Sequence, residues 1–124
     1  MDLGPTAKII IADDTIPMMM ALRRALTQLG YANIIEAENG AEAFTALKAN
    51  PDTALILSDW NMGPMDGLEL LRAVKGDPRF AGVPFILISA DAGAVQGRAL
   101  EAGAAHVLSK PCSADVLRQS IAAL

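Results

Sequence analysis

Four short apolar stretches of this 124-residue chain each end in side chains that can take part in chemistry. In chain order these side chains are Asp13, Asp14, Asp59, Ser89 and Lys110. In open parallel sheets, ligands bind in the crevice just outside the carboxyl ends of the strands. If the four stretches form neighbouring strands, their terminal side chains therefore share one pocket.

Three carboxylates in one pocket repel one another, since one close pair costs about 4 kcal/mol at 4 Å with an effective dielectric of 20. A cation is needed to hold them together, and an all-oxygen ligand set suits Mg²⁺. A lysine and a hydroxyl nearby suit the oxygens of a phosphoryl group. The set predicts a carboxylate nucleophile that accepts phosphate, with Asp59 as the first candidate.

Each of these residues also has an ordinary structural explanation when it is taken alone. An aspartate at a strand end is most often a loop or capping residue, and a serine is common after strands. A lysine before a proline usually lies on the surface. The combination of all five at strand ends is what indicates a site.

Composition restricts the classes of protein that this chain can belong to. Its length fits one domain, residues 1–124, with residues 1–6 as a loose N-terminal tail. The net charge of −4 argues against binding nucleic acid or an anionic membrane, because both favour a basic patch. No apolar run approaches the roughly 20 residues that span a bilayer. The polar N-terminus and single cysteine, Cys112, favour the reducing cytoplasm.

Strand and helix patterns alternate strictly along the chain. Each predicted helix begins near a capping residue, namely Thr15, Asn39, Asp66 or Ser113, except the Gly- and Ala-rich segment 93–102. Five such units indicate a parallel sheet with helices on both faces. The predicted strands are residues 8–12, 32–37, 54–57, 84–88 and 105–109.

The spacing of these motifs resembles the receiver domain of bacterial two-component response regulators along essentially the whole chain. The resemblance rests on the acidic pair, the run 58–62 (Ser-Asp-Trp-Asn-Met) with 65–67 (Met-Asp-Gly), the pair 89–90 and the pair 110–111. Within the family, the Asp-Trp-Asn-Met run is most similar to the stand-alone chemotaxis regulators. The resemblance implies a flavodoxin-like, doubly wound five-stranded parallel sheet of order 2-1-3-4-5 with five helices.

The resemblance also implies a role for each site residue. Asp59 is expected to be the phosphoacceptor of a histidine kinase. Asp14, Asp59 and the backbone carbonyl of Asn61 are expected to ligate Mg²⁺, with Asp13 acting partly through water. Lys110 is expected to pair with the phosphoryl oxygens and to precede a cis peptide bond.

Three further residues are implicated in switching and in the lifetime of the phosphoryl group. Ser89 is expected to move and hydrogen-bond the aspartyl phosphate. Asn61 and Asp91 are expected to flank the water route and set the dephosphorylation rate.

The sequence departs from the family pattern at three positions. Gly63 stands where the family usually has proline, and Pro64 follows it. Val107 stands at the position of the aromatic switch residue. Either mobility of the fourth helix replaces the aromatic swing, or Val107 simply packs in the core. Cys112 replaces a common phenylalanine and is expected to be a small buried filler rather than a redox sensor. His106, the only histidine, is expected to be a strand side chain.

The sequence therefore predicts a phosphorylation-driven switch, not an enzyme acting on a metabolite. Its expected partners are a sensor histidine kinase or phosphotransfer protein, and a downstream protein bound by the fourth helix, fifth strand and fifth helix. A monomer or weak dimer is expected.

Three alternatives remain at this stage. The chain could be a receiver fragment of a larger regulator or hybrid kinase. It could be a phosphate sink or a pseudo-receiver that acts as an interaction module; the complete acidic set argues against a pseudo-receiver, whereas Val107 leaves it open. It could also be a Mg²⁺-dependent phosphohydrolase, although no cap region or substrate-sized aromatic pocket is apparent.

Overall fold

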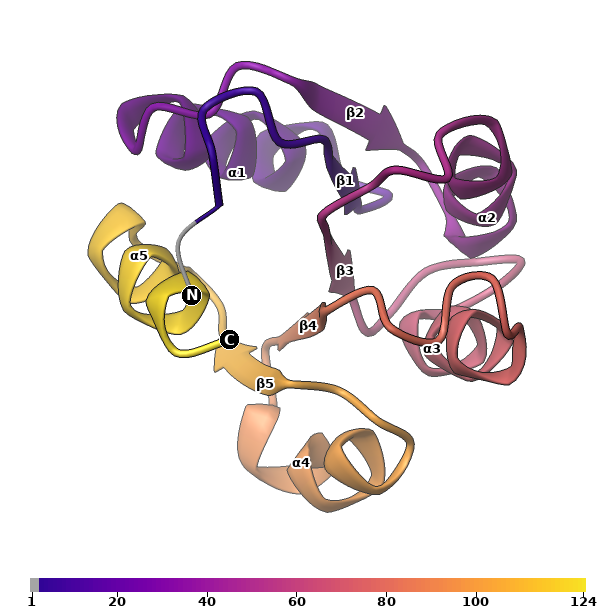
Figure 1. Ribbon diagram of the computed structural model, residues 1–124. Helices are drawn as coiled ribbons and strands as arrows, with labels where there is room; N and C mark the ends of the chain where they lie inside the picture. The colour runs from indigo at the N-terminus through magenta and orange to yellow at the C-terminus, as the bar shows by residue number, and fades with distance from the viewer. Residues whose placement is uncertain (1–2) are drawn as a thin grey trace.

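The computed structural model describes residues 3–124, in which five β-strands alternate with five α-helices (Figure 1). Each predicted strand matches an observed one to within two residues at either end. The predicted tail lies partly outside the described residues. In chain order the elements are β1 (Ile9–Ala12), α1 (Ile16–Gln28), β2 (Ile34–Ala37), α2 (Gly40–Ala49), β3 (Leu55–Asp59), α3 (Gly67–Gly76), β4 (Phe85–Ser89), α4 (Ala92–Glu101), β5 (His106–Ser109) and α5 (Ala114–Ala122).

The five strands form one parallel sheet of order β2-β1-β3-β4-β5, which confirms the predicted topology. Helices α1 and α5 cover one face, and α2, α3 and α4 cover the other (Figure 1). Because every strand runs the same way, the carboxyl ends of all five strands lie at one edge of the sheet.

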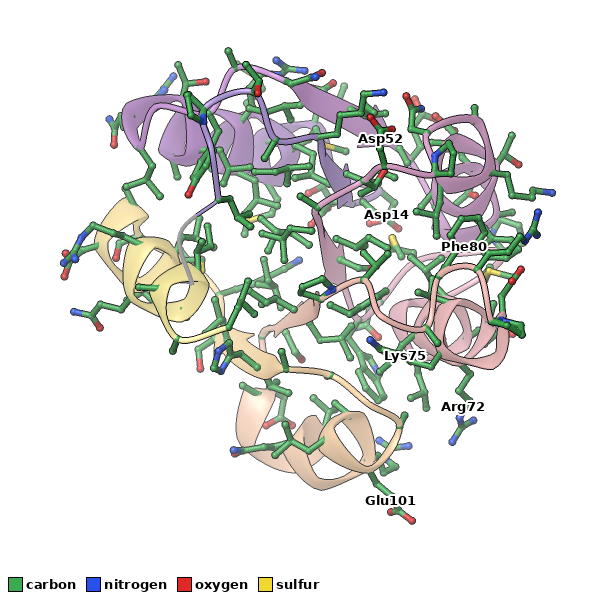
Figure 2. All side chains as sticks on the ribbon, in the orientation of Figure 1. Asp14, Asp52, Arg72, Lys75, Phe80 and Glu101 are labelled. Carbon is green, nitrogen blue, oxygen red and sulfur yellow. The ribbon has the colours of Figure 1, made fainter. Side chains whose placement is uncertain are left out.

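The three central strands are buried on both faces, which explains their nearly continuous apolar sequences. Under α1 and α5, one cluster joins Leu22 and Leu26 to Leu117 and Ile121. Under α2, α3 and α4, a second cluster includes Phe80, which lies between α2 and α3 (Figure 2). No helix within residues 3–124 is long and apolar enough to cross a bilayer.

The helix starts follow the predicted capping residues with one exception. The side chains of Asn39, Asp66 and Ser113 each accept a hydrogen bond from a backbone N–H three residues on. Only Asp66 forms the reciprocal capping box, in which the Glu69 carboxylate accepts a hydrogen bond from the Asp66 N–H. Thr15 occupies the cap position of α1 but makes no side-chain cap hydrogen bond.

The burial of the methionines on α1 differs in part from the sequence pattern, in which the apolar stripe begins at Met18 and leaves Met19 and Met20 exposed. Met18 packs against the core and Met20 is 56% exposed, as this pattern predicts. Met19, however, is buried. The buried stripe therefore begins at Met19 and runs on through Leu22 and Leu26.

The start of α3 is packed directly against the end of β3. The Gly67 N–H donates to the Trp60 carbonyl at 2.9 Å. A Cβ at position 67 would lie 2.2 Å from the Asp59 carbonyl oxygen and 2.8 Å from Leu87 Cδ2. Only glycine therefore allows the first turn of α3 to approach the strand this closely.

We predict that Gly67→Ala destabilises the fold by about 1–3 kcal/mol, because an overpacked buried site must shift its neighbours. Chemical denaturation measures the loss. Gly97→Ala, in the middle of α4, is the matched control, since a Cβ there meets nothing within 4 Å. That control should gain up to about 1 kcal/mol of stability from helix propensity. Equal stabilities of the two variants would contradict the prediction.

Candidate functional site

The strand ends bring together the side chains that the sequence analysis selected. Asp59 is the last residue of β3, and Ser89 is the last residue of β4. In the β3–β4 register Asp59 pairs with Ile88, so Ser89 lies one residue beyond that pair. The Lys110 N–H donates to the Ser89 carbonyl at 3.0 Å, which places the lysine at the same edge.

Three carboxylates form the centre of this edge. One oxygen each of Asp13, Asp14 and Asp59 lies within 4.8 Å of the other two. Asp13 and Asp59 are only 2% and 3% exposed, whereas Asp14, labelled in Figure 2, is exposed. Such an oxygen-only donor set, with one open side, fits Mg²⁺ better than a metal that prefers nitrogen or sulfur.

The Lys110 ammonium links the two buried carboxylates. Its Nζ lies 2.9 Å from Asp59 Oδ1 and 3.3 Å from Asp13 Oδ2. Burial by itself lowers the pKa of Lys110, but the adjacent Asp59 and Asp13 carboxylates outweigh it and raise that pKa above its ordinary value. Lys110 is therefore held as a cation.

Asp59 is less acidic than an ordinary aspartate. Burial raises its pKa most, and the charge of Asp13 raises it further. Hydrogen bonds from Lys110 and from the Asn61 backbone N–H oppose this rise without cancelling it. The fold thus provides hydrogen-bond donors to the Asp59 carboxylate, but the ionised form is still disfavoured in the folded protein.

Asp13 is held by a residue that the sequence analysis assigned elsewhere. The Thr15 N–H and the Thr15 hydroxyl both donate to Asp13 Oδ1, at 2.8 and 2.9 Å. The signal was present in the sequence, because a hydroxyl residue two positions after an aspartate commonly turns back to it.

The remaining predicted site residues surround this centre. Ser89 is buried, and its Oγ accepts a hydrogen bond from the Asp91 N–H at 3.0 Å. The Ser89 hydroxyl proton is therefore available to a ligand. The Asn61 and Asp91 side chains are exposed.

Val107 lies on the Ser89 side of the sheet. It pairs in register with Leu87, two residues before Ser89, and packs half-buried against the α2–α3–α4 core. The Lys110–Pro111 peptide is cis, as expected, and so is Gly63–Pro64.

Trp60, which follows Asp59 directly, connects the loop after β3 to α4. Its indole is half-buried, and its backbone N–H donates to the Ile88 carbonyl at 2.9 Å. The Arg98 guanidinium of α4 lies 5.1 Å from the centre of the indole ring, in cation–π contact.

Cys112 and His106 lie outside the cluster. Burial raises the pKa of the Cys112 thiol to about 11, so the thiol stays protonated and unreactive. This agrees with a filler role. His106 is the first residue of β5 and is half-buried, as expected of a strand side chain.

The comparisons with known proteins agree with the fold and this cluster. Residues 9–122 match the family model described as "Response regulator receiver domain". The chain is 37% identical over 115 residues to chemotaxis protein CheY1 of Helicobacter pylori, covering 92% of this chain and 93% of that protein. This agrees with the expected likeness to the chemotaxis regulators.

Two solved structures place the likeness in three dimensions. One is the signal receiver domain of a signal transduction histidine kinase from Syntrophus aciditrophicus, with TM-score 0.82, 31% identity, and coverage of 96% and 92% of the two chains. The other is the CheX–CheY–BeF3–Mg²⁺ complex from Borrelia burgdorferi, with TM-score 0.85, 25% identity, and coverage of 93% and 86%. By its sequence, its sheet order and its acidic pocket, this chain belongs to the response regulator receiver domain family.

Proposed function

We propose that this receiver domain takes a phosphoryl group onto Asp59 from the phosphohistidine of a sensor histidine kinase or phosphotransfer protein. The observation that carries the proposal is the position of Lys110, whose ammonium lies 2.9 Å from Asp59 and 3.3 Å from Asp13. A cation held there is placed for the oxygens of a phosphoryl group on Asp59.

The transfer is a direct displacement at phosphorus. An Asp59 carboxylate oxygen forms the new O–P bond, and the N–P bond of the donor breaks. The electron pair of that bond stays on the imidazole nitrogen. Because Asp59 is already partly desolvated, its charge is more reactive than a carboxylate surrounded by water.

The residues that would hold Mg²⁺ are Asp14, Asp59 and the backbone carbonyl of Asn61, with Asp13 acting partly through water. The close oxygens of the three carboxylates support this assignment. The Borrelia complex carries Mg²⁺ and BeF3 by its name, which supports the same chemistry in a related fold. Such an ion neutralises charge on the phosphoryl oxygens during transfer.

Switching follows from the groups on the β4 side. The Ser89 hydroxyl, already accepting from the Asp91 N–H, donates its proton to the aspartyl phosphate. The exposed side chains of Asn61 and Asp91 control access of water to the acyl phosphate and so set its lifetime.

The output is a protein contact made by α4, β5 and α5, in a single domain that stays monomeric or dimerises weakly in the cytoplasm. The domain catalyses only its own phosphorylation and dephosphorylation. The likeness to CheY1 of Helicobacter pylori points to a chemotaxis pathway. A phosphate-sink role is the second candidate, because Val107 is too short for the aromatic swing.

We predict that Asp59→Asn abolishes binding of the phosphoryl mimic beryllofluoride in the presence of Mg²⁺, since the variant lacks the anionic oxygen that bonds beryllium. Fluorescence of Trp60, the only tryptophan, measures binding. Asp115→Asn, which removes an exposed carboxylate on α5, is the control and should bind as the wild type does. Binding that survives in the Asp59 variant would refute Asp59 as the acceptor.

We also predict that Asp59→Asn stabilises the fold at pH 7 without divalent cations. A raised folded-state pKa means that the ionised Asp59 is disfavoured in the folded protein, so this cost is present at neutral pH. The gain should shrink as pH falls through the raised pKa toward the ordinary value of 3.8. Urea unfolding from pH 7 to pH 4 measures it. A gain that is absent at pH 7, or constant over this range, would contradict the assignment.

A further prediction concerns α4, which is weakly anchored. Only Val95 and Ala99 of this helix are buried, and Asp91 provides no side-chain cap. We expect Mg²⁺ with beryllofluoride to change the hydrogen-exchange protection of residues 93–103, while residues 67–76 of α3 stay unchanged. Equal protection of residues 93–103 in both states would favour the phosphate-sink role.

A further inference from the structure

Thr15 makes a contact that its position at the start of α1 does not account for. Its backbone is extended, as at a helix start, but its side chain does not cap α1. Instead its N–H and its hydroxyl converge on one oxygen of Asp13, at 2.8 and 2.9 Å. The residue at the cap position thus binds a buried carboxylate of the acidic cluster instead of capping the helix.

This double contact occupies one oxygen of Asp13. A carboxylate oxygen offers about two acceptor positions, so two donors from Thr15 fill Oδ1. Oδ2 accepts from the Lys110 ammonium at 3.3 Å. The two oxygens of Asp13 thus have different partners, since Oδ1 is bound by Thr15 and Oδ2 by Lys110.

The remaining restraint on this orientation is weak. Lys110 is shared, and its contact with Asp59 at 2.9 Å is shorter than its contact with Asp13. Rotation about the Cβ–Cγ bond of an aspartate is soft, so a single backbone donor would leave the carboxylate free to swing. The Thr15 hydroxyl supplies the second donor that fixes the plane of the carboxylate.

We propose that Thr15 is a positioning residue for the acidic pocket: its hydroxyl orients Asp13 and thereby sets the affinity for Mg²⁺. This inference rests on the proposed function, because it assumes that the pocket holds Mg²⁺. Hydrogen-bond partners of metal-binding groups typically contribute 10- to 100-fold to metal affinity. Since Asp13 acts through water, we expect the lower end, about 10-fold.

The sign of the effect follows from the oxygen that is bound. Had the hydroxyl occupied Oδ2, its removal would free an oxygen for the metal and strengthen binding. It binds Oδ1, so its removal leaves the Lys110 contact of Oδ2 in place and loosens the orientation of the carboxylate. Loss of the hydroxyl therefore weakens Mg²⁺ binding.

The test compares Mg²⁺ titrations of the wild type, Thr15→Val, Thr15→Ser and Thr27→Val, followed by Trp60 fluorescence. Valine keeps the shape of threonine without the hydroxyl, whereas serine keeps the hydroxyl. Thr27 lies on the same helix, and its hydroxyl donates to the Arg23 carbonyl at 2.8 Å, so it controls for loss of a threonine hydrogen bond. Thr15 is exposed, so these variants should fold; Thr15→Ala provides a second hydroxyl-free variant.

We expect the Mg²⁺ dissociation constant to rise about 10-fold in Thr15→Val and Thr15→Ala. Thr15→Ser and Thr27→Val should stay within about twofold of the wild type. With a small-molecule phosphodonor, Thr15→Val should need more Mg²⁺ for half-maximal phosphorylation but reach the wild-type rate at saturation.

Two results would overturn the inference alone: wild-type affinity in Thr15→Val, or a loss in Thr15→Ser as large as in Thr15→Val. If the wild type shows no Mg²⁺ binding that depends on Asp59, the inference and the proposed function both fail. A loss of Mg²⁺ affinity confined to Thr15→Val and Thr15→Ala supports both the inference and the proposed function.

Discussion

The carboxyl edge of the sheet depends on one ammonium group placed between two buried carboxylates. At their separation, Asp13 and Asp59 repel by roughly 3–4 kcal/mol with an effective dielectric of 20, and neither can reach bulk water to be screened. Lys110 offsets that repulsion from a position 97 residues away from Asp13 in the sequence. The sheet order makes this possible, because β5 carries Lys110 to the edge that β1 and β3 share. The charge balance of the pocket therefore depends on the arrangement of the strands, which places Lys110 beside Asp13 and Asp59.

Much of this arrangement could be predicted from the sequence because strand ends are marked by chemistry as well as by geometry. The apolar runs before Asp13, Asp59 and Ser89 are buried on both faces, and such runs stop where the strands reach the carboxyl edge of the sheet. The helix caps Asp66 and Ser113 are equally local and were also correct. The strand order cannot be inferred from local sequence patterns. It was expected from the resemblance to the receiver family, and the pairings of β1 with β2 and β3 confirm it.

The features that sequence reasoning missed are those in which two local roles compete for one side chain. Thr15 could cap α1 or bind Asp13, and only the folded geometry shows that it binds Asp13. Glu42 sits three residues after a cap, as Glu69 does, but the reciprocal bond forms only at Glu69. The rotation of α1 that buries Met19 is set by packing against the sheet and α5, which a helical period alone leaves free by a residue.

The contact of Gly67 with Asp59 packs one side of the pocket closely. On the α3 side, the loop 60–66 is closed at its base by the bond from Gly67 to Trp60, with no room for even a methyl group. Farther along the same loop, Met65 packs so closely against Gly40 at the start of α2 that a Cβ on Gly40 would clash with it. On the α4 side, Val95 and Ala99 are the only buried residues of the neighbouring helix. A displacement that starts at Asp59 therefore meets close packing on the α3 side and few buried contacts on the α4 side.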